Sequence, residues 1–290
     1  MIWRAPLAIE VSVVGRDGYS TNLPLDREVE GPIRVSLAGL RAPEVHPMFA
    51  ARLRVFADWH LAAGHDVKII GPRDTQTARR LATLGTALGL TKEVLDLPAP
   101  SPRSDVLPLT KFRRFHDVED VAEAAVELLH QQTGLFGEWG DAVHMAISEL
   151  CDNALQHSNS ELGSYVVADR VTSERLLFRL AIVDLGVGIP EHIRRRHPEW
   201  QDDTGAISRA LVRGVSGTDD PHRGNGFAEV FDLALQTDLV QASSAATLDI
   251  RSGKGRVRAE LFGGNPVYSD PATDRPRQGT WLTYTVTTAG

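Results

Sequence analysis

A carboxylate, an amide and an imidazole recur at four-residue steps in one short run of this chain. Glu149, Asn153 and His157 would share one helix face, because residues four apart are neighbours on a helix. A carboxylate beside an amide suits Mg²⁺ and a water molecule aimed at a phosphate. The same spacing is also typical of a solvated polar face, so the run by itself leaves both interpretations open.

An apolar stripe accompanies these polar side chains. Its members are Val143, Ile147, Leu150 and Ala154. A helix with this pattern can pack one side in a core while its polar side looks into a cavity. Cys151, the only cysteine, lies in the same window, and we expect it to serve packing rather than redox chemistry.

A second candidate segment couples a buried strand to a glycine-rich turn. The apolar run 176–183 leads into Asp184, and Gly186 and Gly188 follow. Such a strand would deliver the carboxylate to the turn, where glycines let a flat ring approach the backbone.

Two more glycine segments follow. The first consists of Arg223, Gly224, Asn225 and Gly226. It precedes a helical pattern over 228–235, and a glycine loop that enters a helix N-terminus favours phosphate oxygens. The second is Gly279 with Thr280, which opens the strand pattern 280–286.

Taken in order, the four segments resemble the ATP-binding domains of the GHKL superfamily, or Bergerat fold, of type II topoisomerases, heat-shock chaperones, histidine kinases and mismatch-repair ATPases. The family's N box matches 149–157, its glycine boxes match 184–188 and 223–226, and its closing Gly-Thr matches 279–280. The resemblance implies a two-layer α/β sandwich over residues 109–290, with ATP and Mg²⁺ as cofactors.

The resemblance also implies roles for single residues. Asp184 would bind the adenine amino group, Asn153 would ligate Mg²⁺, and Thr280 would close over the adenine. Glu149 occupies the position of the general base in members that hydrolyse ATP. The other ATP-binding candidates are His157, Gly186, Gly188, Arg223, Gly224, Asn225 and Gly226.

By the same resemblance, 189–222 would form a lid over the phosphates. It contains the basic run Arg194, Arg195 and Arg196. One of these arginines would reach the phosphates when the lid closes, while a solvated lid face is the alternative interpretation.

Length and proline content predict the domain organisation. At 290 residues the chain is long enough for two domains. The segment 98–108 contains four prolines, which disfavour helix and remove backbone donors, and it is predicted to link residues 1–97 to residues 109–290.

The first domain is predicted as strand 33–37, helix 44–63, strand 67–70 and helix 75–88, with a further strand in 7–14. This order indicates a small parallel or mixed sheet covered by helices, and it resembles the STAS fold of anti-sigma-factor antagonists. Switchable STAS proteins carry a serine at the start of the first long helix, but the segment 41–47 contains none. The STAS-like domain would therefore dock a regulatory protein without being phosphorylated.

The second domain is predicted to begin with a helix over 117–132 and to contain a hairpin, 247–251 and 256–261, around the turn 252–255. Histidine kinases carry a phosphoacceptor histidine on a helical hairpin before the ATP domain. A single helix is too short for that hairpin, which disfavours His116 and His130 in this role.

Charge and hydropathy limit the kinds of binding partner that the chain is expected to have. The net charge of −7 arises after Thr110, where 26 Asp and Glu against 18 Lys and Arg give −8, while the residues up to Thr110 carry +1. This balance disfavours duplex DNA as a partner, because non-specific binding to duplex DNA depends on neutralised phosphates. A second copy of the chain, in a homodimer, is a further candidate partner. No apolar run approaches the roughly 20 residues of a bilayer span, and no signal-peptide pattern opens the chain, so we expect a cytoplasmic protein without membrane contact.

Three functions fit these features. The first is an ATP-dependent enzyme, either an ATPase or a protein serine kinase similar to the anti-sigma-factor kinases. The second is a non-catalytic ATP sensor whose nucleotide state controls a protein–protein interface. The third, a mechanical ATPase, would ordinarily need a transducer domain. Glu149 favours the enzyme, acting in a bacterial-type signalling or regulatory assembly, with the sensor as the alternative.

Overall fold

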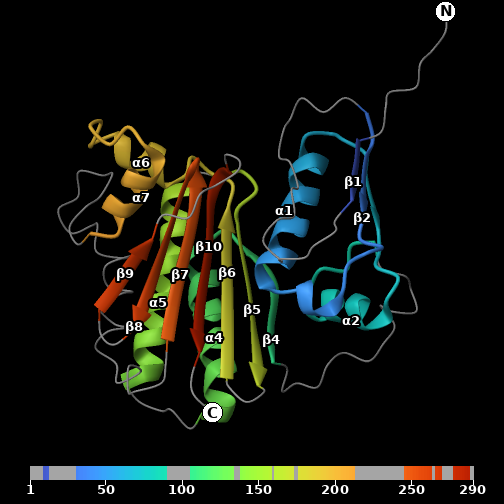
Figure 1. Cartoon of the computed structure of the whole chain (residues 1–290), viewed down its shortest axis with the longest axis horizontal. Helices are drawn as coiled ribbons and strands as arrows, with labels where there is room; N and C mark the ends of the chain where they lie inside the picture. The colour runs from blue at the N-terminus through green and yellow to red at the C-terminus, as the bar shows by residue number, and fades with distance from the viewer. Residues whose placement is uncertain are drawn as a thin grey trace, which may run out of the picture. The chain divides into compact units, whose positions relative to one another are not determined.

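The computed structural model describes residues 9–12, 31–89, 105–133, 138–158, 160–172, 176–212, 245–262, 265–269 and 277–287. The chain divides into two compact units, residues 1–104 and 105–290 (Figure 1). Among the described helices, none combines the length and the apolar character that a bilayer crossing requires.

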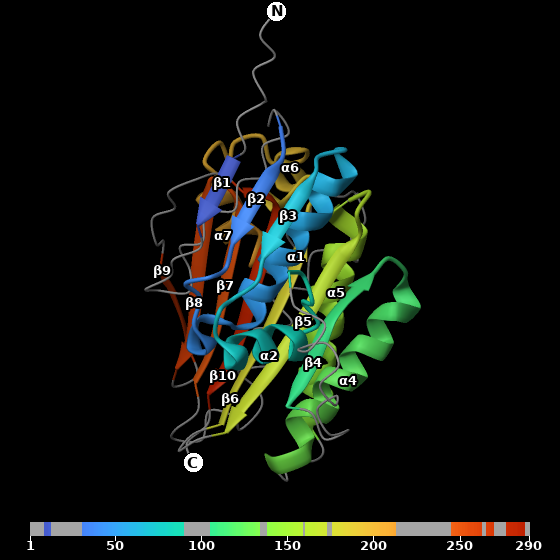
Figure 2. The ribbon, with the colours of Figure 1, turned by 90° about the vertical axis from the view of Figure 1, so that its right-hand side faces the viewer.

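The first unit contains a three-stranded parallel sheet. Its strands β1 (Ile9–Ser12), β2 (Ile33–Ser36) and β3 (Val67–Ile70) lie in the order β1-β2-β3 (Figure 2). The 3-10 turn η1 (Ala42–Glu44) and the helix α1 (Pro47–Ala62) connect β2 to β3, and the helix α2 (Thr75–Thr83) follows β3. The strands β2 and β3 with the helix α1 between them form a βαβ unit. The predicted order of strands and helices indicates such a parallel sheet with helices.

Local sequence sets the ends of these helices. Pro47 occupies the first turn of α1, where its missing N–H costs nothing, and His46 accepts a hydrogen bond from the Phe49 N–H as the N-cap. The helix therefore begins later than the predicted residue 44. The helix α2 ends at Thr83, short of the predicted residue 88, because Gly85 adopts a left-handed φ of 77° that stops a helix.

The second unit contains a seven-stranded antiparallel sheet in the order β4-β5-β6-β10-β7-β8-β9. The strands are β4 (Val106–Phe112), β5 (Ser164–Thr172), β6 (Leu176–Asp184), β7 (Ala245–Gly253), β8 (Gly255–Phe262), β9 (Asn265–Ser269) and β10 (Arg277–Thr287). The strands β7 and β8 form the predicted hairpin, and β10 contains the predicted strand 280–286. The last strand of the sequence thus lies in the middle of the sheet.

Two long helices, α4 (Phe115–Thr133) and α5 (Glu138–Ser158), cover one face of this sheet (Figure 1, Figure 2). Their apolar side chains, including Val121 and Leu150, share one core with Phe178 and Leu282 of the sheet. Two shorter helices, α6 (Ile189–Arg194) and α7 (Asp203–Ala210), pack against β7, and α7 also contacts β8. The unit is a two-layer α/β sandwich, as predicted for residues 109–290.

The predicted linker 98–108 is wrong at its C-terminal end. Residues 98–104 lie outside the described residues, but Val106 to Pro108 belong to β4. This strand forms the edge of the sheet, and its pairing with β5 shifts between Leu107 and Thr110. Pro108 therefore stands at an irregularity of an edge strand, where a proline does not break the ladder.

Candidate functional site

Four polar residues lie in register across the end of the seven-stranded sheet. Ser164 pairs with Asp184, Asp184 with Thr280, and Thr280 with Ser252 on adjacent strands. Each lies two positions from a residue of the core, so all four face the helical layer. We name this set the polar row. Ser164, Asp184 and Ser252 are buried within it.

Asp184 is the acidic member of the polar row. It is only 3% exposed, and its Oδ1 accepts the Gly186 N–H at 2.9 Å. Burial raises the pKa of Asp184 to about 7, although hydrogen bonds from Gly186 and from the hydroxyl and N–H of Thr280 lower it in part. A carboxylate has about four acceptor positions, so this group keeps capacity for a further donor. Strongly shifted carboxyls of this kind gather at functional sites.

Helix α5 joins the polar row through a side-chain contact. Ser164 Oγ donates to the Ala154 carbonyl at 3.2 Å. The described members of the predicted apolar stripe, Ile147, Leu150 and Ala154, are buried. Glu149 and Asn153 are half-buried on the same helix. Burial raises the pKa of the Cys151 thiol, which fits its predicted packing role.

Asn153 has an unmet hydrogen-bonding requirement. Its Nδ2 is buried, and the described residues include no hydrogen-bond partner for it. The two amide atoms exchange places by a rotation, so either the donor or the acceptor can point to that position. A buried amide without a partner needs an explanation, and a bound ion or ligand is one.

The residues of α5 fit a magnesium ion that is shared with phosphates. Within the described ranges, no group of three or more His, Cys, Asp or Glu side chains could hold a metal ion. Mg²⁺ that bridges nucleotide phosphates uses one or two protein carboxylates and fills its remaining positions with water and phosphate. The amide oxygen of Asn153 is an oxygen donor of the kind this ion accepts, and Glu149 stands one helical turn before it.

Two glycines allow chain segments to meet closely at the polar row. Gly188 has a φ of 80° and Gly279 a φ of 71°. A Cβ on Gly279 would lie 2.1 Å from the Asp184 carbonyl oxygen, and a Cβ on Gly188 would lie 2.6 Å from Ser252 Oγ. Any other residue type would push the turn after Asp184 away from the sheet.

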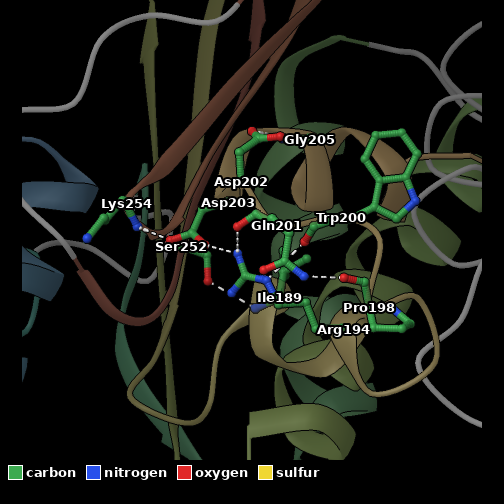
Figure 3. A network of polar contacts seen from close by, with 10 residues as sticks. All are labelled: Ile189, Arg194, Pro198, Trp200, Gln201, Asp202, Asp203, Gly205, Ser252 and Lys254. Carbon is green, nitrogen blue, oxygen red and sulfur yellow. Dashed lines mark hydrogen bonds and ion pairs between the residues drawn. The ribbon is translucent and has the colours of Figure 1, made fainter.

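The lid predicted over 189–222 begins as a packed helix pair. Arg194 bonds to the Asp203 carboxylate, and its Nε donates to the Trp200 carbonyl at 3.0 Å (Figure 3). Asp203 also accepts the Lys254 N–H at 2.6 Å, which joins α7 to the β7–β8 turn. Arg194 therefore stabilises the helix pair, and the expectation that one arginine of the run 194–196 reaches the phosphates stays a prediction.

A cavity of about 310 Å³ adjoins the glycine turn. Its wall includes Val187, Arg194 and Gly279. Asp184 and Asn153 are not among its lining residues, so the cavity neighbours the polar row rather than containing it.

Several predicted site residues lie outside the described ranges. These are Arg223, Gly224, Asn225 and Gly226, together with the side chain of His157. Conversely, the sequence patterns missed Ser164 and Ser252, whose hydroxyls contact residues 10 and 63 positions away. The sequence signal that could have found them is the alternation of side chains along a strand. Each serine lies two residues beyond an inward-facing apolar residue and therefore points to the same face of the sheet.

No family model and no curated protein matches the sequence. Among solved structures, the B-subunit of the DNA gyrase from Myxococcus xanthus shows 13% identity and a TM-score of 0.27, over 58% of this chain and 42% of that one. The 43K ATPase domain of Thermus thermophilus gyrase B, in complex with an aminocoumarin, shows 16% identity and a TM-score of 0.26, over 61% and 41% of the two chains. The mycobacterial sensor histidine kinase MprB shows 18% identity and a TM-score of 0.27, over 63% and 96%. The match spans about two fifths of each gyrase chain, and likeness this low leaves the function to be argued from the residues of this chain.

Proposed function

We propose that residues 105–290 bind Mg-ATP at the polar row and use it as an ATPase or a protein serine kinase. The observation that carries this proposal is the buried Asp184, held by Gly186 and Thr280 while it keeps capacity for one more donor. The amino group of adenine is such a donor, and a turn built from glycines lets a flat base come close. The GHKL resemblance of the sequence assigns adenine to the same residue.

Each residue of the site would have a separate role in binding or catalysis. Asp184 accepts from the adenine amino group, and Thr280, directly opposite on β10, closes the same end of the site. Asn153 offers its amide oxygen to Mg²⁺, which neutralises phosphate charge when bound. Glu149 stands one helical turn before Asn153, where its carboxylate can take a proton from an attacking water or hydroxyl.

A non-catalytic ATP sensor is the second candidate. The Ser252 hydroxyl contacts the start of α6, and Asp203 of α7 contacts the β7–β8 turn. Nucleotide binding beside these contacts could change the surface that α6 and α7 present to a protein, without turnover.

We further propose that residues 1–104 dock a regulatory protein in a cytoplasmic signalling assembly. Support comes from the parallel sheet with its connecting helix, which agrees with the STAS-like order of elements, and from the absence of serine in the segment 41–47. The partner would be a different regulatory protein or a second copy of the chain.

Incubation of the pure protein with Mg²⁺ and γ-labelled ATP, with and without cell extract, separates these functions. Free labelled phosphate would indicate an ATPase, and labelled protein would indicate a kinase. Bound Mg-ATP without either product would indicate the sensor. A chain that binds no adenine nucleotide would contradict the proposal as a whole.

A further inference from the structure

Ser252 lies at the junction of three segments around Asp184. Its hydroxyl accepts the Ile189 N–H at 3.0 Å (Figure 3) and donates to the Gly279 carbonyl at 2.7 Å. We propose that Ser252 is a positioning residue of the nucleotide site, whose single hydroxyl holds the glycine turn and the Gly279–Thr280 segment in the arrangement that binds adenine. This inference rests on the ATP-binding function proposed above.

The two partners of Ser252 belong to the two segments that donate hydrogen bonds to the Asp184 carboxylate, the glycine turn and the Gly279–Thr280 segment. Ile189 ends the glycine turn that begins after Asp184, while Gly279 precedes Thr280, the residue that pairs with Asp184. A hydroxyl has one donor and two acceptor positions, so one group can serve both segments at once. Ser252 is 0% exposed, so water does not compete for either bond.

Close packing makes the two segments depend on each other. A Cβ on Gly188 would lie 2.6 Å from Ser252 Oγ, and a Cβ on Gly279 would lie 2.1 Å from the Asp184 carbonyl oxygen. Segments packed this closely shift together rather than one at a time. Loss of the hydroxyl should therefore loosen both sides of the adenine position.

The residues after Ser252 extend this connection to the lid helices. Lys254 forms the β7–β8 turn, and its N–H donates to the Asp203 carboxylate at 2.6 Å. The strand end that holds the glycine turn is thus the same strand end that holds α7.

Ser252→Ala should weaken Mg-ATP binding by about tenfold. Without the hydroxyl the glycine turn adopts other conformations, and the apparent affinity falls with the fraction of molecules that have the binding-competent one. The same substitution should speed hydrogen exchange of the Ile189 amide in the nucleotide-free protein, as measured by NMR. Ser252→Thr keeps the hydroxyl. If this hydroxyl still protects the Ile189 amide from exchange, the variant should bind Mg-ATP like the wild type, and if the protection is lost, its affinity should fall as in Ser252→Ala.

Ile250→Val provides the matched control. Ile250 lies two residues before Ser252 on β7, faces the same core and is buried. The substitution removes one methylene and neither hydrogen bond. Its Mg-ATP affinity and its Ile189 exchange should both match the wild type.

Affinity and protection of the Ile189 amide should change together across the four proteins. A variant in which one changes without the other would overturn the inference, as would an alanine variant unchanged in both or a weakened Ile250→Val control. Wild-type protein that binds no adenine nucleotide would instead overturn the proposed function, whatever the exchange rate of Ile189.

Discussion

Asp184 lowers the stability of the folded chain, and its neighbours offset this only in part. Burial raises the pKa of Asp184 from its usual 3.8 to about 7. The folded state therefore binds a proton more tightly than the unfolded state, so this group makes the free energy of unfolding fall as the pH rises from about 4 to about 7. The loss at higher pH amounts to about 4 kcal/mol. A group this unfavourable is expected where binding, rather than folding, requires it.

Asp184→Asn should separate stability from binding. At about pH 8 the variant should unfold at a higher urea concentration than the wild type, because position 184 no longer buries a charge, while its affinity for Mg-ATP falls. At about pH 4 the difference in stability should nearly vanish, since the wild-type carboxyl is then protonated when folded. Urea unfolding at both pH values measures this.

Asp169→Asn is the control for the stability experiment. Asp169 is also buried, but Arg179 donates to both of its carboxylate oxygens, at 2.8 and 2.6 Å. Loss of that charge leaves the Arg179 guanidinium without an opposite charge and with one acceptor fewer, so the control should be less stable than the wild type. An Asp184→Asn variant that is destabilised at about pH 8 in the same way would contradict the account of Asp184.

Replacement of Glu149 and replacement of Asn153 should affect nucleotide binding and turnover differently. Asn153→Ala should lose Mg²⁺-dependent nucleotide affinity and any turnover together, because it removes a metal ligand. Glu149→Gln should keep binding and lose about 10²–10⁴ in rate, as expected for a general base. Binding and single-turnover assays distinguish the two, and a Glu149→Gln variant with the wild-type rate would remove Glu149 from this role.

At the scale of elements, the β7–β8 turn and helix α7 fit together through two glycines. A Cβ on Gly255 would lie 2.6 Å from the carbonyl carbon of Asp203, and a Cβ on Gly253 would lie 2.3 Å from its carboxylate. Backbone this close to the start of α7 leaves no room for a methyl group. The hairpin therefore sets where the lid helices begin.

Gly255→Ala should displace α7 and destabilise the unit by about 1–3 kcal/mol. Trypsin should then cut faster at Arg194 to Arg196, on the helix pair that α7 supports. Gly39→Ala is the control, because a Cβ there meets no atom within 4 Å. Equal cleavage of the two variants would show that the hairpin does not hold the helix pair.

The elements were predictable where the signal is local. The hairpin around 252–255 and the strand 67–70 follow from alternation and turn residues, and the structure has both. The end of α2 does not follow from periodicity, because the φ of Gly85 stops the helix inside an otherwise helical pattern. The roles of Ser164 and Ser252 were not predictable, since they depend on which strands become neighbours.

At the scale of the whole molecule, the proposed site belongs entirely to residues 105–290. Ligand that binds only the native state adds about 2.7 kcal/mol of stability at one hundred times Kd. Mg-ADP should therefore slow hydrogen exchange in peptides from α5, β6 and β10 while peptides from β2 and β3 stay unchanged. Protection confined to β2 and β3 would place the nucleotide in the other unit.

Equilibrium dialysis with labelled Mg-ATP tests the central claim most directly. We predict saturable binding by the wild type, binding weakened by about tenfold or more in Asp184→Asn, and wild-type affinity in the Asp169→Asn control, provided that it is assayed where it is folded. Wild-type protein without saturable binding, or an Asp184→Asn variant that binds as tightly as the wild type, would contradict the claim.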